Sequence, residues 1–268
     1  MDNIITIMAL CLLLGAVVGV LAGLLGIGGG LIIVPVLAFI FQKFLGVSIE
    51  YGMQMAIASS LSTVIFTGLS SARSHYKLGN IDKKIVVVCG IGIAFGAVFG
   101  ALFATQISGV ILKRIFAGLV LLIALQMIFG RNRVSNVSIG NPTYATIGLG
   151  SGFVASLMGI GGGAILVPVL VWFQTHIKTA IGCAALCGVV IATFGTATFI
   201  FSGWNADFLP QYAFGYVYLP ATIGIALTSM ITAPIGAKLT VKLDTQKLKK
   251  IFAVFLVLVS IRLIIGLE

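Results

Sequence analysis

The chain contains one unusual string twice, and this repeat limits its fold more than any other feature. Residues 23–37 read Gly-Leu-Leu-Gly-Ile-Gly-Gly-Gly-Leu-Ile-Ile-Val-Pro-Val-Leu, and residues 156–170 read Ser-Leu-Met-Gly-Ile-Gly-Gly-Gly-Ala-Ile-Leu-Val-Pro-Val-Leu. Glycine triplets weaken a helix, and an interior proline removes a backbone donor. In lipid, such a break is tolerated only where the freed backbone groups are buried in protein or line a cavity. Two Gly/Pro-interrupted segments in corresponding positions of two halves predict a transporter-type binding site.

The composition places this pair of breaks in a membrane. The chain is 60% hydrophobic and only 8% charged, whereas a soluble domain carries roughly 25% charged residues. A net charge of +10 would suggest a nucleic-acid partner in a soluble protein. Here the basic residues cluster between apolar runs, which is typical of cytoplasmic loops beside a lipid bilayer, so we expect no nucleic acid. The four cysteines predict no disulfide framework, and Met1-Asp2-Asn3 lacks the positive region of a signal peptide.

Ten apolar runs predict the membrane segments of an all-α polytopic protein with 8–10 membrane helices. Residues 1–130 form a first membrane repeat, residues 131–141 a polar cytoplasmic linker, and residues 142–268 a second membrane repeat. Each repeat is expected to hold a glycine-broken hairpin and three further spans. The runs are Ile4–Leu25, Leu31–Phe41, Met55–Ser71, Ile85–Thr105, Ile111–Phe129, Tyr144–Met158, Ala164–Phe173, Ala180–Phe201, Leu219–Ala237 and Ile251–Leu267.

Positive charge decides whether the two repeats are parallel or inverted, because Lys and Arg concentrate in cytoplasmic loops. An inverted second half puts both termini outside and makes each broken segment return to its starting side. Four parallel crossings per half would instead leave more cations outside than inside. The inverted arrangement places on the cytoplasmic side Arg73, Lys77, Lys83, Lys84, Arg131, Arg133, Lys178, Lys238, Lys242, Lys247, Lys249 and Lys250. It leaves on the outer side only Lys43, Lys113, Arg114 and Arg262.

The inverted arrangement brings the two glycine breaks together near the midplane. Leu31 and Ala164 then begin half-helices, whose first amides lack acceptors and carry a partial positive charge. The expected backbone donors to an anion are Gly28, Gly29, Gly30, Gly161, Gly162 and Gly163, with Pro35 and Pro168 fixing the breaks. The alternative is that the glycines only permit close helix packing. A nucleotide fingerprint is a poor interpretation, because no acidic ribose partner follows.

Five side chains are further candidates for binding the substrate. Ser59 and Ser60 can donate hydroxyls to an anion, although Ser and Thr in helices also bond their own carbonyls. Cys183 could contact a sulfur substrate, or be a small apolar residue. Gln126 and Arg262 occupy equivalent repeat positions, and a charge inside an apolar run is a functional candidate by default. Arg262 could instead extend to the outer interface.

The acidic residues point to the charge of the substrate. All six (Asp2, Glu50, Asp82, Asp207, Asp244 and Glu268) fall outside the apolar runs. Proton relays and metal-dependent membrane enzymes need buried carboxylates or histidines, so we expect no metal, no cofactor and no enzymatic activity. With the cytoplasm negative, an anion moving outward gains about 2.3 kcal/mol per 100 mV, which favours export.

These motifs resemble a known family. The paired Leu-Leu-Gly-Ile-Gly-Gly-Gly…Val-Pro-Val-Leu strings look like those of the TauE/SafE family of sulfite exporters and sulfonate-uptake permeases. The stretch from Ala58 to Asp82, with His75-Tyr76-Lys77-Leu78-Gly79-Asn80-Ile81-Asp82, is similar to that family's Gly-Thr-Ser…His-Tyr-x-x-Gly-Asn-Val-Asp segment. The resemblance implies transport of a small sulfur-containing anion such as sulfite, sulfoacetate or thiosulfate across a bacterial or archaeal inner membrane.

The resulting hypothesis is a secondary carrier that works by alternating access of two inverted halves. Two alternatives stay open. An anion channel would use the same lining, and an intramembrane enzyme would need a catalytic set that the sequence does not offer. The sequence does not indicate the oligomeric state.

Overall fold

The computed structural model describes residues 2–25, 29–129, 140–206, 209–239 and 245–266. This part of the chain forms ten α-helices and one short hairpin, so the predicted all-α polytopic fold is confirmed. The elements are α1 (Asp2–Leu25), α2 (Gly30–Phe44), α3 (Ile49–Lys77), α4 (Lys83–Gln106), α5 (Gly109–Phe129), α6 (Asn141–Met158), α7 (Gly163–Trp172), α8 (Ile177–Ser202), β1 (Ala213–Phe214), β2 (Val217–Tyr218), α9 (Leu219–Leu239) and α10 (Thr245–Ile265). The predicted 131–141 linker lies mostly outside the described residues.

The helices carry large apolar side chains outward and small residues inward, as lipid-facing helices do. Six helices in the described chain are long and apolar enough to cross a membrane, while α2 and α7 are shorter apolar helices. In α4, Phe95 and Phe99 are 59% and 57% exposed, whereas Gly96 and Gly100 are buried. A soluble helix would show the reverse pattern.

Glycines bring the most closely packed helices into backbone contact. A Cβ on Gly96 of α4 would overlap the carbonyl of Leu149 on α6, and one on Gly100 would meet Phe153. On the other side of the bundle, Gly15 of α1 lies against α9 in the same way. Such small-residue interfaces supply the van der Waals packing that holds helices together in lipid.

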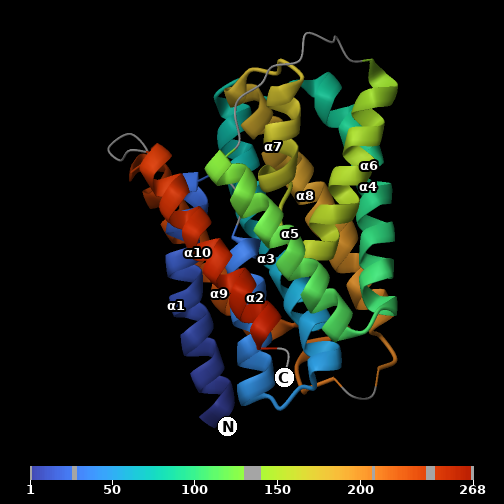
Figure 1. The fold of residues 1–268 in the computed structure, drawn as a ribbon, viewed down its shortest axis with the longest axis vertical. Coiled ribbons are helices and arrows are strands. Elements are labelled where there is room, and N and C mark those ends of the chain that lie inside the picture. The colour runs from blue at the N-terminus through green and yellow to red at the C-terminus, as the bar shows by residue number, and fades with distance from the viewer. Residues whose placement is uncertain (1, 26–28, 130–139, 207–208, 240–244, 267–268) are drawn as a thin grey trace.

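The two broken segments enter the bundle from opposite ends (Figure 1). Helix α1 rises from the end where both termini lie, and α2 returns from the middle to that same end. Helices α6 and α7 form the equivalent hairpin at the other end. At the second break, α6 ends at Gly159, which has the left-handed conformation that favours glycine (φ 68°, ψ 27°). The amide of Ile160 then bonds the carbonyl of Ala155 at 3.0 Å, as at a Schellman-type helix end.

The most extensive helix contacts are preserved when the two halves are exchanged. Pairing α1 with α6, α2 with α7, α3 with α8, α4 with α9 and α5 with α10 turns the α4–α6 contact into α9–α1 and leaves α3–α8 and α5–α10 unchanged. Helices α3 and α8 run antiparallel, since Leu61 lies near Gly195 and Gly68 near Val189. This is the pairing expected of inverted repeats. Because no bilayer fixes the two sides, the inverted topology and the repeat boundaries stay predictions.

The cations separate between the two ends of the bundle. Lys43 lies at the end of α2, and Lys113 donates to the carbonyl of Gly266 near the C-terminus. The opposite end carries Lys77, where α3 ends, and Lys83, where α4 begins. These four cations agree with the predicted two sets. Arg131, Arg133 and Lys242 lie outside the described residues, and the identity of the cytoplasmic end stays a prediction.

Candidate functional site

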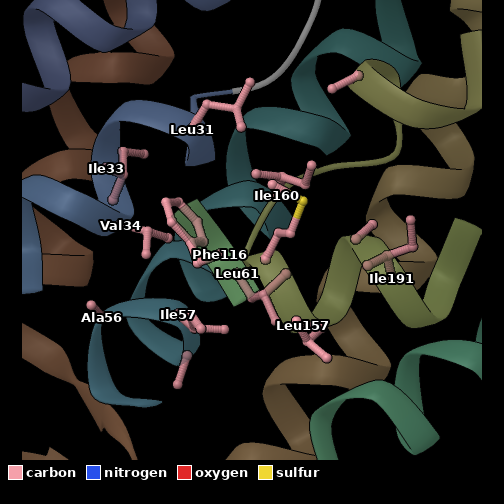
Figure 2. Packing of buried hydrophobic residues seen from close by; sticks show 14 of the residues in the cluster. Leu31, Ile33, Val34, Ala56, Ile57, Leu61, Phe116, Leu157, Ile160 and Ile191 are labelled. Atoms are coloured by element: carbon pink, nitrogen blue, oxygen red, sulfur yellow. The ribbon is translucent and has the colours of Figure 1, made fainter. Parts of the chain in front are cut away.

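The two glycine breaks touch each other in the centre of the bundle. Gly30, the first residue of α2, is buried against the turn after α6, and a Cβ there would overlap the carbonyl oxygen of Gly159. The same Cβ would lie 2.8 Å from the Cα of Ile160. Figure 2 shows Leu31 and Ile160 among the buried side chains of this region. Only a residue without a side chain permits this approach.

The helices that start at the breaks begin one residue before the predicted positions, at Gly30 and Gly163. Gly29 and Gly162 precede them with no side-chain cap, and the first amides of any helix lack an intrahelical acceptor. Gly161 is next to Val64 of α3, and Gly162 is next to Gly188 of α8. Gly28 lies outside the described residues. The glycines therefore both permit close packing and leave the two helix starts without side-chain caps, and their predicted contact with an anion stays a prediction.

The two predicted serines are fully buried and already hydrogen-bonded. Ser60 Oγ donates to the carbonyl oxygen of Gly159 at 2.7 Å, so α3 holds the second break in place. Ser59 Oγ accepts from the amide of Tyr218 at 2.9 Å. A neighbour, Ser62, bonds the carbonyl of Ser59 at 2.7 Å, which is the backbone bonding typical of helical serines. In this arrangement the serines position the site.

The contact with Tyr218 reveals an element that the sequence did not predict. Strands β1 and β2 form a hairpin whose second strand is buried against α3. The Tyr218 ring meets Phe41 of α2 edge-on, with 5.4 Å between ring centroids. Gly215 at the hairpin turn, with φ of 54°, is the sequence feature that could have indicated it.

Two buried hydroxyls near the second break were not predicted from the sequence as site residues. Ser156 and Thr196 are 0% and 6% exposed, and their oxygens have no hydrogen-bond partner in the described chain. Ser156 precedes Gly159 by three residues, and its Oγ would be 2.9 Å from a Cβ on Gly195. Buried hydroxyls without partners are rare in proteins. Both can therefore donate a hydrogen bond to a ligand.

Cys183 lies against the loop between α3 and α4. The Asp82 amide donates to its Sγ at 3.4 Å, and Sγ lies 3.7 Å from the Asp82 carbonyl oxygen. This contact gives the thiol a packing partner, while its predicted contact with a sulfur substrate stays a prediction. The described residues contain no group of three His, Cys, Asp or Glu that could hold a metal ion.

Gln126 and Arg262 line two separate cavities. The α5–α7 cavity, of about 190 Å³, contains Gln126, and the α2–α10 cavity, of about 430 Å³, contains Arg262 and Pro35. Pro168 lies inside α7, as Pro35 lies inside α2. The cavities share repeat-equivalent positions: Ile165 and Ile32, Val169 and Val36, Leu119 and Phe255, Ile123 and Val259, and Gln126 and Arg262.

Comparisons with known proteins cover nearly the whole chain. The family described as "Sulfite exporter TauE/SafE" matches residues 11–263. A protein of Haemophilus influenzae named "Probable membrane transporter protein" is 40% identical over 260 residues, covering 96% of this chain and 98% of the relative. YunE of Bacillus subtilis, also named a probable membrane transporter, is 28% identical over 94% of this chain and 95% of its own length. A probable membrane transporter of Methanocaldococcus jannaschii is 28% identical over 91% of this chain and 90% of its own. No solved structure matches.

Proposed function

The chain belongs to the TauE/SafE sulfite exporter family of membrane transporters, and on this premise we propose that it carries a small sulfur-containing anion. The expected substrates are sulfite, sulfoacetate and thiosulfate. The proposed location is the cytoplasmic membrane of a bacterium or archaeon, with both termini on the outer side. The single observation that carries the proposal is the contact between the two glycine breaks, Gly30 against Gly159.

The anion is bound by the main chain at these breaks. The N-termini of α2 and α7 offer the amides that follow Gly29 and Gly162, and the partial positive charge of a helix start favours an anion there. Ser156 and Thr196 offer two further donors, since both hydroxyls are buried and have no partner among the described residues. A neutral set of donors suits a solute that must also be released, because no fixed charge holds it.

Alternating access follows from the paired hairpins. The α1–α2 hairpin and the α6–α7 hairpin meet at their breaks, one from each end of the bundle (Figure 1). The α2–α10 and α5–α7 cavities run along α2 and α7 and differ in volume, about 430 against 190 Å³. Exchange of the two hairpin positions would enlarge the second cavity and reduce the first, which is how inverted repeats give the opposite-facing state.

Export is the proposed direction. An outward-moving anion gains about 2.3 kcal/mol per 100 mV of membrane potential, and such export needs no coupled proton. The described chain holds no carboxylate or histidine cluster of the kind that a metal-dependent membrane enzyme would use. The proposed function is transport without enzymatic activity, in line with the relatives, which are named probable membrane transporters.

The experiment is flux of labelled sulfite, sulfoacetate, thiosulfate, phosphate and chloride in proteoliposomes under an imposed potential. A carrier gives saturable flux of at least one sulfur anion, moves charge, and shows counterflow when unlabelled anion is loaded on the other side. Saturable flux without counterflow, or unsaturable flux, would assign a channel. The proposal fails if protein-containing and protein-free vesicles move every sulfur anion at the same rate.

A further inference from the structure

The α2–α10 cavity combines two cations with a helix N-terminus. Arg262 of α10 and Lys113 of α5 line it, together with Gln42 and Ser48, and none of its described lining residues is acidic. The cavity follows α2 from Gln42 to Ile32, which at 1.5 Å per residue is about 15 Å. It therefore extends from the end of the bundle that holds both termini to within two residues of the central break.

Within the described residues, both cations are held in place by groups that are not acidic. The Arg262 guanidinium carbon lies 5.4 Å from the centre of the Phe39 ring, a stacking contact that leaves the N–H edge of an arginine free for an oxyanion. Among the described residues, Lys113 Nζ donates to the carbonyl of Gly266 at 2.8 Å, and an ammonium has three donors. Both side chains can therefore donate to a ligand in the cavity.

Helix α3 begins at the same cavity. Its N-cap residue, Ser48, makes no side-chain capping bond, and both Ser48 and Ile49 line the cavity. The partial positive charge at this helix start adds to the two cations. A hydroxyl that is not used for capping is a further donor to an oxyanion.

The described lining of the equivalent α5–α7 cavity lacks this charge. Gln126 occupies the position that corresponds to Arg262, and the remaining lining of the α5–α7 cavity is apolar. Among the pairs of equivalent residues that line the two cavities, only Gln126 and Arg262 differ in charge. The duplication alone therefore does not explain the arginine, and the charge belongs to one end of the molecule.

We propose that the α2–α10 cavity is a second oxyanion site, in which Arg262, Lys113 and Ser48 bind a small tetrahedral or pyramidal oxyanion. The role of this site is to hold the transported anion between the membrane surface and the central break. Only this role rests on the proposed function, which the inference deepens. The same chemistry would also bind the phosphate of a lipid headgroup, and the experiment separates these two sources.

Arg262→Gln tests the site directly, since it gives this cavity the residue that the equivalent position carries. Arg114→Gln is the matched control, because it removes the same charge from the next residue of α5, which does not line the cavity. The first measurement is equilibrium binding of labelled sulfite and thiosulfate to the purified chain in detergent, which requires no transport. Arg262→Gln is expected to weaken binding by about tenfold, the lower end of the range for the loss of one charged hydrogen bond, because the site is partly solvated. Arg262→Lys should restore part of the affinity, and Arg114→Gln should leave it unchanged.

The second measurement is the amount of anionic phospholipid that each variant retains, determined by native mass spectrometry. Loss of retained phosphatidylglycerol in Arg262→Gln, with unchanged solute binding, would support the site with a lipid headgroup as its ligand. Weaker solute binding in a protein that shows no flux would support the site while the proposed function fails. The inference is overturned if Arg262→Gln and Lys113→Gln, both folded, match Arg114→Gln in both measurements.

Discussion

Replacement of Gly30 by alanine tests whether the contact between the two breaks is as tight as the structure has it. The added methyl group would overlap the carbonyl oxygen of Gly159 and lie 2.8 Å from the Cα of Ile160. Both are backbone atoms, so no flexible side chain can move aside. Overpacking of this kind costs about 1–3 kcal/mol. The same carbonyl accepts the Ser60 hydroxyl, and displacing it endangers a hydrogen bond worth about 1 kcal/mol.

Gly118→Ala is the control for this substitution, because a Cβ on Gly118 of α5 meets nothing within 4 Å. Alanine in an open helical position is stabilising by about 0.5–1 kcal/mol relative to glycine. The two variants should therefore differ by about 2–4 kcal/mol, which thermal unfolding in one detergent can resolve. The reasoning is refuted if Gly30→Ala unfolds at the same temperature as Gly118→Ala, or above it.

Three further predictions concern the packing around the site. Ser60→Ala leaves the Gly159 carbonyl without its hydroxyl donor and should lower stability by about 1 kcal/mol, measured by thermal unfolding; an unchanged midpoint would contradict the 2.7 Å bond. Cys183→Ala should leave the affinity for sulfur anions unchanged, because its thiol faces Asp82; a selective loss of affinity would instead support the predicted substrate contact. Gly96→Ala should destabilise the α4–α6 contact by about 1–3 kcal/mol, while Gly90→Ala, in open space, should not; equal unfolding temperatures would refute this.

Much of the fold could be predicted because the length and composition of an apolar run identify a membrane helix. Every predicted apolar run corresponds to a helix, and the breaks fall within one residue of the predicted positions at Leu31 and Ala164. The repeat made it possible to anticipate that the breaks meet. The residue that makes contact with Gly30 is Gly159, which stands before the triplet, because closing the turn after α6 needs a left-handed residue.

The missed features depend on contacts between distant residues. Nothing in the local pattern of Ser156 or Thr196 shows that helix packing leaves these hydroxyls without partners. The β1–β2 hairpin is short, and only its burial against α3 gives it a role. Lys113 resembled an ordinary interfacial cation, and its neighbour Arg114 has the same charge, so only the cavity distinguishes them.

Anion binding and flux by Gly162→Ala test the central claim most directly. Gly162 has right-handed helical angles, and a Cβ there would lie 3.2 Å from the flexible Ile191 side chain and 3.4 Å from the Ala184 carbonyl oxygen, so the variant should fold. The methyl group would stand at the N-terminus of α7, where the anion is proposed to bind. The account predicts an unfolding temperature close to that of the original chain with a loss of saturable sulfur-anion flux. A folded Gly162→Ala protein with unchanged binding and flux would contradict it.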